Sequence, residues 1–145
     1  MAQYLIGIDV GKSTGLAVWD GNTRKLLEVT SLPIHAALEK VKNLAAFYSF
    51  RNYGVTVVFE DARLRKWYGR QTAEKDRARL QGAGSVKRDS VIWEDALKDW
   101  GIDYRKVAPK NNLTKLSAEA FRRLTGWTQR TNEHGRDAAM LVFRR

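Results

Sequence analysis

A chain of 145 residues, 43% of them hydrophobic, is long enough to bury one core and too short for two ordinary domains. Its 26 Lys and Arg residues exceed its 16 Asp and Glu residues by ten, so we expect a polyanionic partner, first nucleic acid and second an anionic membrane. The absence of cysteine excludes disulfides and zinc–thiolate sites. We therefore expect a single domain over residues 1–145, in which carboxylates and two histidines bind any metal.

The membrane is the weaker expectation of the two partners. No apolar run approaches the roughly 20 residues that a spanning helix needs. The first four residues also lack the basic and apolar regions of a secretion signal. We expect a soluble intracellular protein without a membrane partner.

The first 60 residues predict three antiparallel strands, a helix and a fourth strand. Apolar runs at 4–10 and 15–19 form a hairpin, and a turn signal at 20–22 leads to a third strand at about 25–30. Pro33 opens a helix whose apolar residues recur with helical spacing until Gly54. The β-branched run at 55–59 is typical of a strand buried on both faces. This strand, helix and strand make a crossover unit.

The second half of the chain predicts three helices and one weak strand. Residues 62–79 are charged and poorly periodic, and Gly82 and Gly84 then precede a helix that Gly101 ends. A strand at 102–108, a helix at 114–124 and a last helix at about 134–143 follow. We expect an α/β fold: a mixed five-stranded sheet, with three antiparallel strands followed by crossover strands, and helices on both faces.

Three acidic residues stand where carboxylates are unusual. Asp9 interrupts an apolar strand, Glu60 ends the buried fourth strand, and Asp137 lies on an apolar helix with His134 one turn earlier. Each has an ordinary alternative explanation: Asp9 as a turn cap, Glu60 as the start of a solvated loop, and His134 with Asp137 as an exposed pair near a helix start. The three positions together, in a basic chain, favour a metal site for a hard cation.

Three motifs resemble those of the RuvC-type Holliday junction resolvases. The segment IGIDVG at 6–11, with Thr14-Gly15, is similar to their first-strand motif, VVFE at 57–60 to their second acidic motif, and HGRDAA at 134–139 to their C-terminal motif. Between them, 80–84 and 104–110 stand where that family has a glycine-bounded helix and a strand ending in proline and lysine. Each motif alone is weak, but their order and spacing run along most of the chain.

The resemblance implies a ribonuclease H-like fold, a homodimer and hydrolysis of phosphodiester bonds in four-way DNA junctions by paired symmetric nicks. It implies two Mg²⁺ ions, for which Mn²⁺ substitutes, and a cytoplasmic, nucleoid-associated protein of a bacterial or phage-infected cell. By motif position, the catalytic and metal-binding residues are Asp9, Glu60, His134 and Asp137. The chain departs from the family in its short length, in Asp61 and the basic residues after Glu60, and at 111–117, which leaves substrate preference open.

A basic segment with interleaved aromatic residues follows Glu60. Charge beside aromatic rings is expected where phosphates are bound and unpaired bases are stacked. A solvated, salt-bridged surface is the alternative for each residue alone, and equally for the two lysines after the weak strand. The predicted DNA contacts are Arg63, Arg65, Lys66, Trp67, Tyr68, Arg70, Lys110 and Lys115.

Trp93 and Trp100 share one stripe of the helix at 85–100, which we expect to serve as core or as the dimer contact.

Other functions remain as alternatives. A phosphate-binding loop at Gly11-Lys12-Ser13 fails because Ile6 stands where that motif needs a glycine. The first strand also resembles the phosphate motif of sugar kinases and actin-like ATPases, but those proteins need two such domains. A non-catalytic DNA-binding relative stays open, as does a ribonuclease H-like nuclease acting on RNA or on flap or replication-branch DNA.

Overall fold

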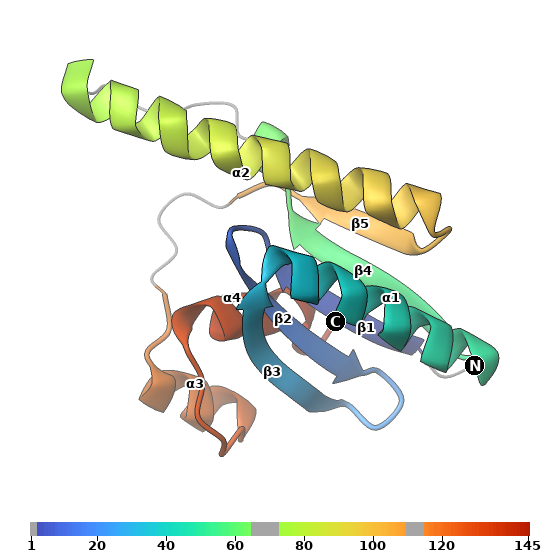
Figure 1. Ribbon diagram of the computed structural model, residues 1–145. Helices are drawn as coiled ribbons and strands as arrows, with labels where there is room; N and C mark the ends of the chain where they lie inside the picture. The colour runs from blue at the N-terminus through green and yellow to red at the C-terminus, as the bar shows by residue number, and fades with distance from the viewer. Residues whose placement is uncertain (1–2, 65–72, 110–114) are drawn as a thin grey trace.

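A single mixed sheet organises the chain. The computed structural model describes residues 3–64, 73–109 and 115–145, with side chains omitted for 73–83. Five strands lie in the order β3-β2-β1-β4-β5, as Figure 1 shows. Antiparallel pairing joins β1 to β2 and β2 to β3, whereas β4 runs parallel to both β1 and β5. The strands are β1 (Gln3–Asp9), β2 (Ser13–Asp20), β3 (Lys25–Pro33), β4 (Gly54–Glu60) and β5 (Asp103–Val107).

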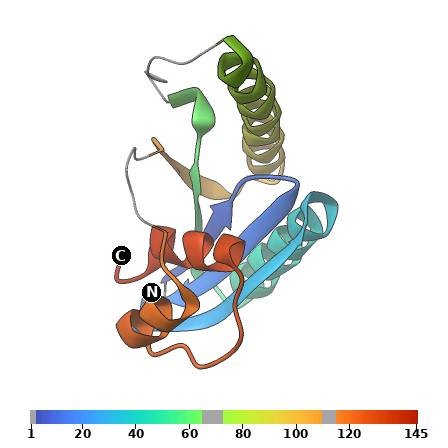
Figure 2. The same cartoon turned by 90° about the vertical axis from the view of Figure 1, so that its left-hand side faces the viewer.

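Helices cover both faces of this sheet (Figure 2). On one face, α1 and α2 enclose a core in which Ile6 and Ile8 meet Val41, Trp93 and other apolar side chains. On the other face, α4 and Phe121 of α3 pack against Leu5, Ala17 and Val58. Alternate residues of β1 thus serve opposite cores, as the pleat of a strand requires. The helices are α1 (Ile34–Phe50), α2 (Ala73–Asp99), α3 (Ala118–Thr125) and α4 (Glu133–Val142), with a short 3₁₀ turn η1 (Ala62–Leu64).

The α/β class, the mixed five-stranded sheet and the helices on both faces are therefore confirmed. The predicted start of α2 was wrong, because the helix begins at Ala73 and runs through both Gly82 and Gly84. Its first turns, AEKDRARLQ, consist largely of strong helix formers. A helical glycine costs only about 1 kcal/mol relative to alanine, so these two residues do not stop the helix.

The predicted start of α3 was also early. The helix begins at Ala118, and the Ser117 hydroxyl caps it by accepting a hydrogen bond from the Ala120 amide at 3.1 Å. Serine at this position satisfies one of the amides that have no partner within the helix, which stabilises a start here rather than at Thr114.

Trp93 and Leu97 of α2 are fully buried within the protomer, against the sheet and α1. Trp93 is therefore a core residue, which is one of the two roles expected of the stripe of Trp93 and Trp100, and Trp100 is partly buried against the same core. The dimer contact expected on this helix stays a prediction. Val91 and Ile92 are the large apolar side chains that this part of α2 leaves exposed. Within the described residues, no helix combines the length and apolar character needed to cross a membrane.

Candidate metal centre

Two of the predicted metal ligands end neighbouring parallel strands. Asp9 is the last residue of β1 and Glu60 the last residue of β4. The register pairs Ile8 with Phe59, so the next residue on each strand is an acidic one. Both side chains are partly exposed at this edge of the sheet. Strand pairing alone therefore brings together two carboxylates that are 51 residues apart in sequence.

Two glycines allow α4 to reach the same edge. A β-carbon on Gly15 of β2 would lie 1.9 Å from the carbonyl oxygen of His134, and one on Gly7 of β1 would lie 2.2 Å from that of Ala138. Any side chain at either position would collide with the helix backbone, which cannot swing aside as a flexible side chain does. The glycines of the first-strand motif thus allow α4, which carries the C-terminal motif, to pack closely against the sheet.

Asp9 and His134 form the central contact of the site. His134 Nδ1 lies 3.0 Å from Asp9 Oδ2, and the two side chains are 36% and 27% exposed. With the proton on Nδ1, the imidazole donates to the carboxylate and leaves Nε2 as an electron-pair donor. Asn132 holds the start of α4 in place, because its side chain accepts a hydrogen bond from the Gly135 amide at 2.9 Å.

Asp137 lies one turn further along α4 and pairs with Lys115. Lys115 Nζ is 3.4 Å from Asp137 Oδ2, and the nearby carboxylate raises the pKa of Lys115. Burial raises the pKa of Asp9, and the negative charge of Asp137 adds to this, although the hydrogen bond from His134 opposes it. Asp9, His134, Asp137 and Lys115 therefore interact electrostatically as one group.

Arg136 holds Lys115 close to α4. Its Nε donates to the Leu116 carbonyl oxygen at 2.9 Å, and its Nη1 donates to the Thr131 hydroxyl at 3.0 Å. One guanidinium thus connects α4 to Leu116 and Thr131, which lie on either side of α3 in the sequence. None of the three motifs implies a function for Arg136, whose one signal in the sequence is its place inside HGRDAA.

The acidic residues of the site suit a metal ion in their chemistry but do not converge on one point. Among residues 3–64, 73–109 and 115–145, no three Asp, Glu or His side chains converge closely enough to hold an ion as they lie. The chemistry of Asp9, Glu60 and Asp137 nevertheless suits a hard divalent cation, because all three offer carboxylate oxygens. Burial also disfavours the negative charge of Asp9, and a bound cation would remove this energetic penalty.

Arg63, a predicted DNA contact, forms ion pairs with two carboxylates of the protein. Its guanidinium pairs with Asp61 at 2.6 Å and with Glu94 at 2.8 Å. These hydrogen bonds raise the pKa of Arg63. Lys115 is exposed beside Asp137. The other predicted contacts lie outside the described residues: Arg65, Lys66, Trp67, Tyr68, Arg70 and Lys110.

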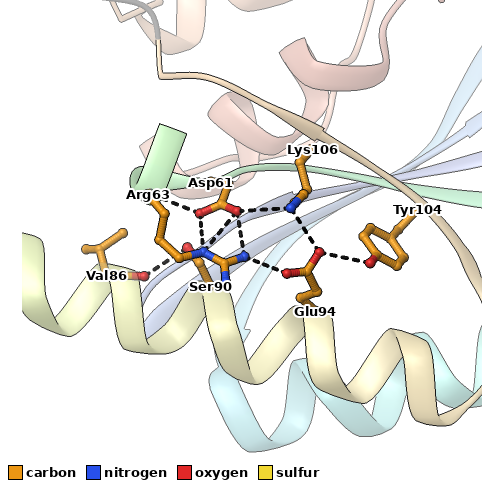
Figure 3. A network of polar contacts seen from close by, with 7 residues as sticks. All are labelled: Asp61, Arg63, Val86, Ser90, Glu94, Tyr104 and Lys106. Carbon is orange, nitrogen blue, oxygen red and sulfur yellow. Dashed lines mark hydrogen bonds and ion pairs between the residues drawn. The ribbon is translucent and has the colours of Figure 1, made fainter. Parts of the chain in front are cut away.

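The ion pairs of Arg63 belong to a polar network that the sequence analysis missed (Figure 3). Burial is the largest single influence and would raise the pKa of Asp61 and Glu94, but the hydrogen bonds and positive charges around each carboxylate together outweigh it. With further hydrogen bonds from Lys106 and Tyr104, the pKa of Glu94 falls from 4.5 to about 2. A signal was present, since Glu94 stands next to Trp93 and three residues before Leu97 on a buried stripe.

Fold and site thus define an α/β protein with acidic residues and a histidine gathered where β1 and β4 end. No protein-family model matches the chain, and no curated protein is significantly similar to it.

Proposed function

We propose that this protein is a metal-dependent DNA endonuclease with a ribonuclease H-like fold, related to the RuvC-type resolvases, that cuts branched DNA as a homodimer. The observation that carries the proposal is the 3.0 Å contact between Asp9 and His134. These residues are 125 positions apart in sequence. They come from two of the three motifs that resemble the family. If that resemblance were due to chance, nothing would require the two motifs to lie in contact.

Each side chain has a role that follows from its contacts. Asp9, Glu60 and Asp137, with His134, would hold two Mg²⁺ ions, which would supply an activated water and stabilise the leaving oxygen. His134 orients the Asp9 carboxylate through the Nδ1 contact. Lys115 is placed by its Asp137 pair to meet a phosphate oxygen that enters the site.

The charge of the chain supports a nucleic-acid substrate. A formal net charge of +10 attracts a phosphate backbone whatever its sequence. The arginines at 122, 123 and 130 are exposed, as Lys115 is. We further propose that the segment following Glu60 contacts DNA through Arg65, Lys66, Trp67, Tyr68 and Arg70, and that Lys110 does so near the metals.

Amide variants of the carboxylates test the function. Asp9→Asn, Glu60→Gln and Asp137→Asn should each abolish cleavage of a labelled four-way junction in Mg²⁺. Loss of an outer partner of a metal ligand costs about 10–100-fold, so loss of a ligand should cost more. Junction binding in the presence of a chelator should change little, since the affinity comes mainly from phosphate contacts.

The control is Glu28→Gln, which removes a carboxylate that pairs with Lys40 between β3 and α1. This variant should cleave like the wild type. Folded amide variants that lose binding in step with cleavage would contradict the proposed metal site. Flap, duplex and RNA–DNA hybrid substrates in the same assay identify the preferred nucleic acid.

A further inference from the structure

A polar network with two buried carboxylates begins at the residue after Glu60. The Asp61 side chain is 1% exposed, and its amide donates to the Val107 carbonyl oxygen at 2.9 Å, which extends the pairing of β4 with β5. Its carboxylate accepts Arg63 Nε at 2.8 Å and Nη2 at 2.6 Å. Both the backbone and the side chain of Asp61 are therefore fixed, one peptide bond from a proposed metal ligand.

Glu94 of α2 is the centre of this network (Figure 3). Its carboxylate accepts Arg63 Nη2 at 2.8 Å and the Tyr104 hydroxyl at 2.8 Å, and Lys106 Nζ lies 3.0 Å away. The side chain of Glu94 is only 10% exposed. Through Glu94 the C-terminal third of α2 is joined to η1 and to β5, on either side of the end of β4.

The composition of the network does not suggest a ligand site. Two carboxylates face two cations and one hydroxyl, so the formal charges balance, and both carboxylates accept hydrogen bonds from within the protein. Burying such a network is weak evidence of stabilisation, because apolar residues of similar volume often do as well. Hydrogen bonds are directional, however, so those of the network hold the residues that form them in one position.

We propose that Glu94, acting through Arg63 and Asp61, is a positioning residue that holds Glu60 in place for metal binding. This inference rests on the proposed function, since it takes Glu60 to be a metal ligand. Glu94 itself touches no metal and no substrate. Its effect travels from α2 through the Arg63 guanidinium to the Asp61 carboxylate, and from there along one peptide unit.

Glu94→Gln is the direct test, because it keeps the shape of the side chain and removes its charge. The Mg²⁺ concentration for half-maximal junction cleavage should rise about tenfold, the lower end of the effect known for outer partners of metal ligands. The increase in melting temperature produced by Mn²⁺ should shrink in parallel. Junction affinity in chelator should equal that of the wild type, which a general loss of structure would not allow.

Two further variants keep the test decisive. Glu28→Gln removes an ion-pairing carboxylate outside the network and should leave the Mg²⁺ requirement unchanged. If Glu94→Gln does not fold, Tyr104→Phe removes one hydrogen bond from the same carboxylate and should raise the requirement by a smaller factor. A wild-type Mg²⁺ requirement in a folded Glu94→Gln or Tyr104→Phe variant would overturn the proposal.

The two proposals fail in different ways. If the wild type cleaves no nucleic acid, the proposed function is wrong, and the Mn²⁺-induced change in melting temperature alone decides the positioning role. A change that is absent in the wild type, or equal in wild type and Glu94→Gln, overturns that role. If the wild type cleaves and Glu94→Gln shows the same metal requirement, only the positioning role is lost.

Discussion

Asp9 carries a charge that its surroundings disfavour. Burial and the neighbouring Asp137 raise its pKa, and the hydrogen bond from His134 only partly compensates. A carboxyl group whose pKa is higher in the folded state than in the unfolded state destabilises the fold once the pH rises through that folded pKa. Below its ordinary value of 3.8 the carboxyl is protonated in both states, and the penalty disappears.

Replacing Asp9 with Asn should therefore stabilise the protein in the absence of metal. At pH 7 in chelator, we expect the melting temperature to rise by about 2–4 °C, which corresponds to about 1 kcal/mol for a chain of this size. Thermal unfolding from pH 7 to below 3.8 should show the gain vanishing as the pH falls. Mg²⁺ should stabilise the wild type more than the variant. An equal or lower melting temperature at pH 7 would contradict clustering of the carboxylates.

The contact between α4 and the sheet depends on glycines that a strand does not otherwise favour. Glycine weakens a strand by its conformational freedom, so Gly7 and Gly15 are costly unless something needs the space. Here the backbone of α4 needs it, at His134 and at Ala138. Helix α4, which carries His134 and Asp137, can therefore pack this closely against the sheet only because Gly7 and Gly15 have no side chains.

Gly15→Ala should destabilise the protein and displace His134 from Asp9. Overpacking usually costs about 1–3 kcal/mol, and a clash with backbone lies at the upper end of that range. Thermal unfolding should show the loss, and junction cleavage should fall with it. The matched control is Gly84→Ala in α2, where a β-carbon meets nothing within 4 Å, and this variant should gain about 0.5–1 kcal/mol. Equal stability of the two variants would contradict the close approach of α4.

The sequence predicted elements better than it predicted their contacts. Continuous apolar runs identified β1 and β4, because both faces of each strand are covered, and helical spacing of apolar residues identified α1, which has one apolar face. The start of α2 was missed since this stretch has little apolar periodicity to mark its beginning. Asp9 and Glu60 were found because a carboxylate in an apolar strand is an anomaly. Arg63 and Glu94 were not, because their pairing depends on a fold that brings together residues 31 positions apart.

At the scale of the whole molecule, the candidate metal centre and the projecting part of α2 lie on connected elements. Figure 1 shows the N-terminal part of α2 extending beyond the sheet, while its C-terminal part covers the core. The polar network joins the C-terminal third of this helix to the residues that follow β4. DNA bound along the projecting part would therefore act on a helix that is tied to the strand carrying Glu60.

A junction resolvase must cut two strands of like polarity at related points, and a two-fold dimer supplies two identical sites for this. Since Trp93 and Leu97 are buried, Val91 and Ile92 are the large apolar side chains that α2 exposes to a partner over residues 84–99. The wild type should sediment as a dimer at micromolar concentration, and Ile92→Glu should sediment as a monomer that remains folded.

The dimer should bind four-way junctions far more tightly than duplex of equal length and release nicks placed symmetrically about the branch point. Ile92→Glu should still make single cuts but should no longer make paired nicks. Each protomer keeps its own carboxylates, and the variant loses only the placement of the two sites relative to each other. Sedimentation and strand-specific labelling measure the two effects separately. A monomeric wild type that cuts RNA–DNA hybrids at least as fast as junctions would contradict the resolvase assignment, but it would leave the candidate metal centre unaffected, because that site consists only of residues within one protomer.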